Sequence, residues 1–115
     1  MDPQRAAATL RELRAATQAR AAVLSDELAG VVHASADSNA DDEHDPEGAT
    51  IAFERGQLIA LRDHAVAQLV EIDAALARIA SNTYGHCLRC GDRLTEERLA
   101  ARPAATLCVR CAARD

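Results

Sequence analysis

Apolar and small residues recur at helical spacing through the first third of the chain. They stand three or four residues apart, at Leu10, Leu13, Thr17, Ala21, Leu24, Leu28 and Val31. Such a stripe is what one face of a long, packed helix presents to a partner. Asp2 can cap this helix, and Pro3 suits its first turn because proline has no N–H to leave unpaired. The pattern predicts a helix over residues 3–33, with Gly30 weakening its last turns.

A second stripe follows a strict seven-residue repeat. Its members are Ile51, Leu58, Ala65, Ile72 and Ile79, with Leu61, Leu69 and Leu76 as companions. This predicts a helix over residues 48–81, about 45–50 Å long at about 1.5 Å per residue. Residues 34–47 between the stripes are rich in Asp, Ser and Asn, which stop helices and form turns. Two long helices joined by one loop predict an all-α fold built on an antiparallel coiled-coil hairpin, residues 1–83.

Composition supports this fold class. The chain has 115 residues with one Tyr, one Phe and no Trp, so its apolar content is mostly alanine and aliphatic side chains. Small side chains fill the thin layer between close-packed helices. With so few aromatic residues, the chain is not expected to form a ligand-binding cage of aromatic side chains. The sequence also lacks a phosphate-binding glycine loop, a GxSxG motif and an HExxH motif. We therefore expect that the protein is not an enzyme.

The net charge of −5 is unevenly distributed. Residues 34–47 hold six acidic residues and no Arg, whereas residues 84–115 hold six Arg against four acidic residues. A protein that binds nucleic acid mainly through phosphates is normally basic, so direct sequence-specific DNA binding is not expected. Neither a membrane span nor a signal peptide is apparent, which predicts a cytoplasmic protein with no membrane partner.

Four cysteines form two Cys-x-x-Cys pairs, Cys87 with Cys90 and Cys108 with Cys111, separated by residues 91–107. Each pair can offer two sulfurs along one edge of a tetrahedron, and this spacing is typical of four-cysteine zinc sites. Four protein ligands close the coordination sphere, so the predicted zinc ion is structural. Disulfides, an iron site and substitution of His86 for one thiolate remain alternatives. Residues 84–115 are predicted to be a zinc finger, in which Thr95 starts a short helix that Pro103 ends.

The finger carries the pattern YG-x-C-x-x-C-G followed by L-x-A-R-P-x-A-x-L-C-x-x-C. The matching residues are Tyr84, Gly85, Cys87, Cys90, Gly91, Leu99, Ala101, Arg102, Pro103, Ala105, Leu107, Cys108 and Cys111. With the preceding hairpin, this pattern resembles the DksA/TraR family of bacterial RNA polymerase-binding regulators. The chain stops four residues after Cys111, so the resemblance is to a short form of the family.

The resemblance implies a mechanism. In this family the coiled coil enters the secondary channel of RNA polymerase, and the loop at its tip approaches the active centre to modulate initiation. Better-known members carry Asp-x-x-Asp-x-Ala at the tip. The literal match here is Asp42 and Asp45 with Glu47 in place of Ala, whereas counting back from Cys87 gives His44, Glu47 and Ala49. We take Asp42, Asp45 and Glu47 as the expected tip residues.

Two features depart from longer members of the family. The chain has no lysine, and His64 and Glu71 occupy positions on the second helix where basic residues are expected, which argues against a (p)ppGpp site of the familiar kind.

An alternative function is a zinc finger and coiled-coil adaptor, or a DNA-binding module, that does not act through the polymerase channel. A further alternative is stimulation of RNA cleavage in the channel by carboxylates that hold Mg²⁺.

Overall fold

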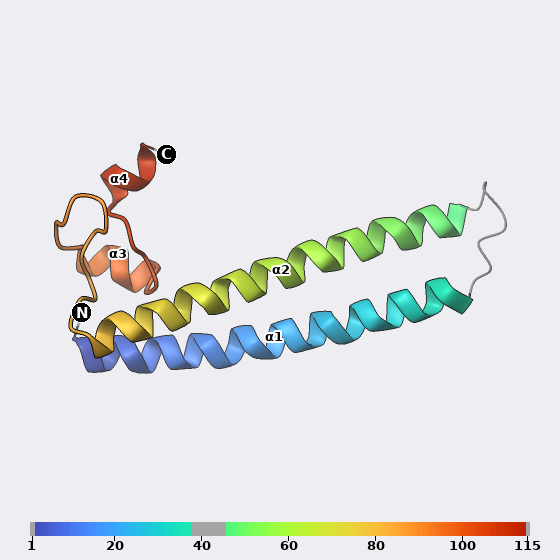
Figure 1. Ribbon diagram of the computed structural model, residues 1–115, viewed down its shortest axis with the longest axis horizontal. Helices are drawn as coiled ribbons and strands as arrows, with labels where there is room; N and C mark the ends of the chain where they lie inside the picture. The colour runs from blue at the N-terminus through green and yellow to red at the C-terminus, as the bar shows by residue number, and fades with distance from the viewer. Residues whose placement is uncertain (1, 38–45, 115) are drawn as a thin grey trace. The chain divides into compact units, whose positions relative to one another are not determined.

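A computed structural model of the chain describes residues 2–37 and 46–114. It contains two long helices, α1 (Pro3–Asp37) and α2 (Pro46–Ala80), and two short ones, α3 (Glu96–Ala101) and α4 (Val109–Ala113) (Figure 1). Within the described residues the only β-pairing is one isolated bridge between His86 and Arg93. The predicted all-α fold, with a helical hairpin and a cysteine-rich C-terminal segment, is confirmed.

Each long helix has 35 residues and begins at a proline. Proline suits this position because the first N–H groups of a helix have no partner within the helix. α1 continues through Gly30, which lies on the exposed side with nothing within 4 Å of where a Cβ would stand. None of the described helices is long and apolar enough to cross a membrane.

Contacts divide the chain into two compact units. We call residues 1–16 and 69–115 the terminal unit and residues 17–68 the middle unit. Each unit contains part of α1 and part of α2. The domain boundary expected between residues 83 and 84 remains a prediction.

In the terminal unit the helices meet through a thin apolar layer. Leu10, Ile72 and Ala75 form its core, and each is at most 2% exposed. Alanine allows the two backbones to approach closely, and the partly buried Leu76 and Ile79 pack against this core. Arg14 closes the edge of this layer, with its Nε donating to Asp73 Oδ1 over 2.7 Å.

The middle unit has the same construction. Its buried residues are Thr17, Leu28, Leu58 and Ala65, and Arg20 donates a hydrogen bond to Gln68 at the edge. All four belong to the stripes expected from the sequence. Arg14 pairs with Asp73, and Arg20, further along α1, pairs with Gln68, which is earlier in α2. This is the antiparallel arrangement expected of a hairpin.

Several positions of the expected stripes are only partly buried, and two are exposed. Leu13 is 39% exposed and Leu61 is 53% exposed. A two-helix layer has only one line of closest approach, so a residue at its flank keeps one side in solvent. The seven-residue stripe that contains Leu58 lies along this line in α2, and its companion Leu61 falls outside it.

The backbone turns at the end of α2, and the cysteine-rich segment begins directly after this turn. Asn82 adopts a left-handed conformation with φ 60°, and Thr83 N–H donates to Arg78 O over 2.9 Å. This pattern closes a helix by satisfying its last carbonyl groups, and asparagine is one of the few residues that tolerate the conformation. The chain therefore turns sharply before Tyr84.

Tyr84 joins the two small cores of the terminal unit. Its ring packs against the helix core around Leu10 and also against the core of the cysteine-rich segment. Its hydroxyl donates to Pro103 O over 2.8 Å, and burial raises the pKa of this phenol. Tyr84 and Ala104, which also packs against the helix core, thus connect the cysteine-rich segment to the helices.

Replacing Leu10 with Ala should lower the free energy of unfolding by about 2–5 kcal/mol, because the cavity falls in a fully buried layer. Leu13→Ala is the matched control on the same helix, and we expect it to cost less than about 1.5 kcal/mol. Urea unfolding followed by far-ultraviolet circular dichroism measures both. Equal losses for the two variants would contradict the packing described above.

Candidate metal centre

The first cysteine pair lies in a tight turn. Gly91 N–H donates to Cys87 O over 2.9 Å, and Cys87 N–H donates to Asp92 O over 2.8 Å. Gly91 has φ +80°, which glycine adopts without strain and other L-residues rarely do. The turn places the sulfurs of Cys87 and Cys90 on the same side of the backbone.

The second cysteine pair begins a helix. Cys108 is the N-cap of α4, and its Sγ accepts from Cys111 N–H over 3.4 Å. The two pairs are joined by α3, where Thr95 caps the first turn by accepting from Arg98 N–H over 3.1 Å. This short helix ends at Ala101, before Pro103, as the sequence predicts.

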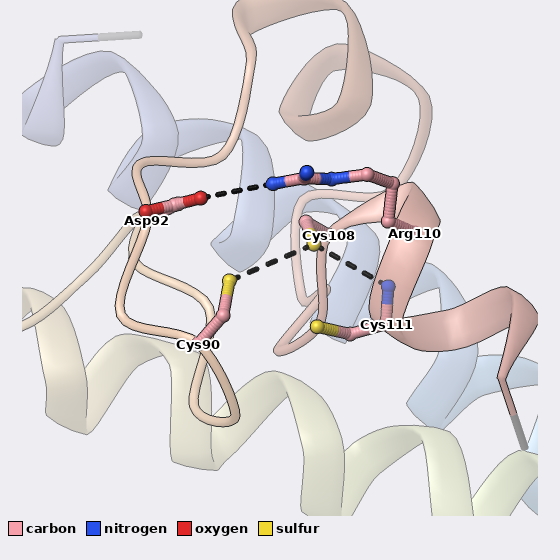
Figure 2. A network of polar contacts seen from close by, with 5 residues as sticks. All are labelled: Cys90, Asp92, Cys108, Arg110 and Cys111. Atoms are coloured by element: carbon pink, nitrogen blue, oxygen red, sulfur yellow. Dashed lines mark hydrogen bonds and ion pairs between the residues drawn. The ribbon is translucent and has the colours of Figure 1, made fainter.

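The two pairs bring four sulfur atoms together. The Sγ atoms of Cys87, Cys90, Cys108 and Cys111 all lie within 4.8 Å of one another. Cys90 Sγ is 3.9 Å from Cys108 Sγ, and Figure 2 shows both atoms and Cys111 Sγ turned toward a common point. Tetrahedral zinc with bonds of about 2.3 Å separates its sulfur ligands by about 3.8 Å, so the spacing suits this ion.

The alternative of disulfide bonds does not fit this geometry. A disulfide joins its sulfurs over about 2.05 Å, and all four cysteines are free. His86 is exposed and does not belong to the group of potential ligands found among the described residues. The donor set is therefore four thiols, which closes a tetrahedral site.

Hydrogen bonds around the site shift the pKa values of the four thiols in both directions. The N–H of Cys90, followed by that of Cys108, lowers the pKa of the Cys87 thiol to about 6. Hydrogen bonding to Cys108 raises the pKa of Cys111 to about 12, so this thiol holds its proton when no metal is bound. Zinc must displace such protons, and its affinity therefore falls as the pH falls.

Three arginines hold the site together from outside. Arg98 Nε donates to Leu107 O and Arg89 donates to Cys111 O, each over 3.2 Å. Arg110, which lies between Cys108 and Cys111, pairs with Asp92 over 3.0 Å and thereby links the second cysteine pair to the segment that follows the first pair (Figure 2). Sequence reasoning missed these contacts, because no local pattern marks which carbonyl a distant guanidinium reaches.

Residues 82–115 match a family described as the prokaryotic dksA/traR C4-type zinc finger. The solved structure of transcription factor DksA2 from Pseudomonas aeruginosa is 28% identical to this chain and superposes with a TM-score of 0.79. The match covers 97% of this chain and 81% of that one. Residues 82–115 are therefore a zinc finger of the dksA/traR C4 type, and the chain is similar to DksA2 over nearly its whole length. The four-cysteine cluster is accordingly a zinc-binding site that holds one structural zinc ion.

Two curated relatives match over shorter stretches. An uncharacterised protein of Aquifex aeolicus is 49% identical over 47 residues, and the RNA polymerase-binding transcription factor DksA of Haemophilus influenzae is 36% identical over 50 residues. These stretches cover 32% and 34% of the two relatives, about one third of their length.

The predicted tip residues lie elsewhere in the chain. Asp42 and Asp45 are outside the described residues, and so is the side chain of Glu47, which follows the first residue of α2. Their role remains a prediction. The cysteines and the tip residues are thus far apart in sequence and belong to separate parts of the proposed mechanism.

Replacing Cys87 with Ser should abolish stoichiometric zinc binding, because a hydroxyl is a poor substitute for a buried thiolate ligand. The segment after Tyr84 should then lose its fixed structure, while α1 and α2 retain most of their helix content. Metal analysis and amide hydrogen exchange measure the two effects. Leu88→Ser alters the adjacent, 66% exposed side chain and should keep one zinc per chain. Full zinc occupancy in the Cys87 variant would contradict the assignment.

Proposed function

We propose that this chain is a transcription regulator that binds RNA polymerase and inserts its coiled coil into the secondary channel to modulate initiation. One observation carries the proposal: the match to DksA2 includes nearly the whole chain, so both the helix pair and the zinc segment have counterparts there. The H. influenzae relative, matched only in part, is itself described as an RNA polymerase-binding transcription factor. Such a regulator acts in the cytoplasm, where the polymerase works.

The proposed role of residues 34–47 rests on their charge. This segment includes the end of α1 and the start of α2, and it carries six acidic side chains and no basic one. In a narrow protein channel with little water, such charge acts strongly on basic side chains or bound Mg²⁺. Asp42, Asp45 and Glu47 are the residues proposed to approach the active centre.

The zinc site has a supporting role in this mechanism. Four thiolates leave no coordination position for water, so the metal holds the segment after Tyr84 and performs no chemistry. The proposed regulator is accordingly not an enzyme. The net charge of −5 disfavours a protein that binds DNA mainly through its phosphates.

Competition for the channel tests the proposal. Purified RNA polymerase holoenzyme should retain the protein in a pull-down, and a factor known to occupy the secondary channel should displace it. Simultaneous binding of both proteins would exclude the channel. A salt-sensitive shift of free promoter DNA by the protein alone would instead support the DNA-binding alternative.

Replacing Asp42, Asp45 and Glu47 together with Ala should weaken the effect on transcription about tenfold or more while leaving polymerase affinity within about threefold. The reason is that the acidic group acts at the active centre, whereas the helices and the finger supply most of the binding surface. Multiple-round transcription and a binding titration measure the two effects.

The matched control replaces three exposed acidic residues of α1, Glu12, Asp26 and Glu27, with Ala. It removes the same charge from another place and should keep regulation near the wild-type level. If the tip variant regulates as well as the wild type, the assignment of the tip is wrong.

A further inference from the structure

The zinc segment has a hollow on its surface beside the metal site. The hollow has a volume of about 210 Å³, and Arg93, Arg98 and Arg110 line it together with Asp92, Cys108 and Val109. All of these residues belong to the terminal unit. Three guanidinium groups against one carboxylate give the lining a formal charge of +2 before the metal site is counted.

The arginines differ in how firmly they are held. Arg98 is half-buried, and its Nε is fixed by Leu107 O, so its remaining N–H groups have a restricted orientation. Arg110 is 78% exposed and pairs with an Asp92 side chain that is itself 62% exposed. An exposed ion pair contributes little to stability, so Arg110 can exchange this carboxylate for another one at small cost.

The volume of the hollow and the side chains that line it determine which chemical groups can bind there. The hollow is smaller than the roughly 300–1,000 Å³ of typical small-molecule pockets, but it has room for a short side chain. Guanidinium groups bind carboxylates through paired N–H donors. Val109, 64% exposed, offers an apolar contact at the same place.

We propose that this arginine hollow receives an aspartate or glutamate side chain of RNA polymerase, an assignment that rests on the function proposed above. The hollow lies on the zinc segment and is therefore separate in sequence from the acidic residues 34–47. It gives the zinc segment a specific contact of its own with the polymerase.

A protein carboxylate fits better than a nucleic acid. Binding of single strands relies on aromatic side chains that stack on bases, and the whole chain has one Tyr and one Phe. Tyr84 is half-buried with its hydroxyl bonded to Pro103 O, so it is not available for stacking. The net charge of −5 also opposes attraction of a polyanion from a distance.

The metal site itself favours a short-range contact. Four thiolates and one Zn²⁺ carry a formal charge of −2, and Cys108 lies at the hollow. This charge cancels much of the arginines' field at long range. The guanidinium groups act mainly on a carboxylate that touches them, which suits a docked side chain in a protein interface.

The test compares the affinities of three variants for purified RNA polymerase from the same organism. Arg93→Glu places a negative charge in the hollow and should weaken binding about tenfold. Arg114→Glu makes the same charge change at an exposed residue outside the hollow and should stay within about threefold. Asp92→Asn removes the internal competitor of Arg110 and should tighten binding about threefold. Zinc content and circular dichroism establish that each variant is folded.

The outcomes separate this proposal from the one on which it rests. If the wild type binds polymerase and Arg93→Glu binds equally well, the hollow is not a docking site, although the proposed function stands. If the wild type does not bind polymerase, both proposals are overturned. A shift of promoter DNA or RNA that Arg93→Glu abolishes would assign the hollow to phosphate groups and overturn the carboxylate.

Discussion

The convergence of four sulfur atoms is the constraint on which residues 84–115 depend. Their apolar core has only four buried members, two of which, Cys87 and Cys111, are themselves ligands. So small a core supplies little free energy of folding, and a bound zinc ion adds what the apolar side chains lack. The turn at Gly91, the cap at Cys108 and the arginine contacts to nearby carbonyls are all geometries that the closed metal site holds in place.

The two long helices are stabilised differently, by a thin apolar layer whose buried residues include both alanine and leucine. Ala65 and Ala75 are fully buried, and their small size lets the backbones lie close together. Tyr84 then links the helix layer to the metal-bound segment through one ring and one hydroxyl hydrogen bond. The metal therefore stabilises a segment that is attached to the helices by packing, and each part of the chain has its own source of stability.

Much of this organisation could be predicted from local patterns. The seven-residue repeat marked α2, and the cysteine spacing marked the metal ligands, because both signals lie within short stretches of sequence. The exposure of Leu13 and Leu61 could not be predicted in this way, since it depends on which line of each helix comes closest to the other. The hydrogen bonds from Arg89 and Arg98 to carbonyl groups are also tertiary, and nothing near these residues in sequence specifies their partners.

The central proposal is that the acidic segment of residues 34–47 reaches the active centre of RNA polymerase through the secondary channel. The most direct measurement replaces the active-centre Mg²⁺ with Fe²⁺, so that hydroxyl radicals formed at the metal cut any polypeptide close to it. In a complex of the polymerase with this protein, we expect the cuts to fall within residues 34–47. Cuts within residues 84–115, or an intact chain that remains bound, would contradict the proposal.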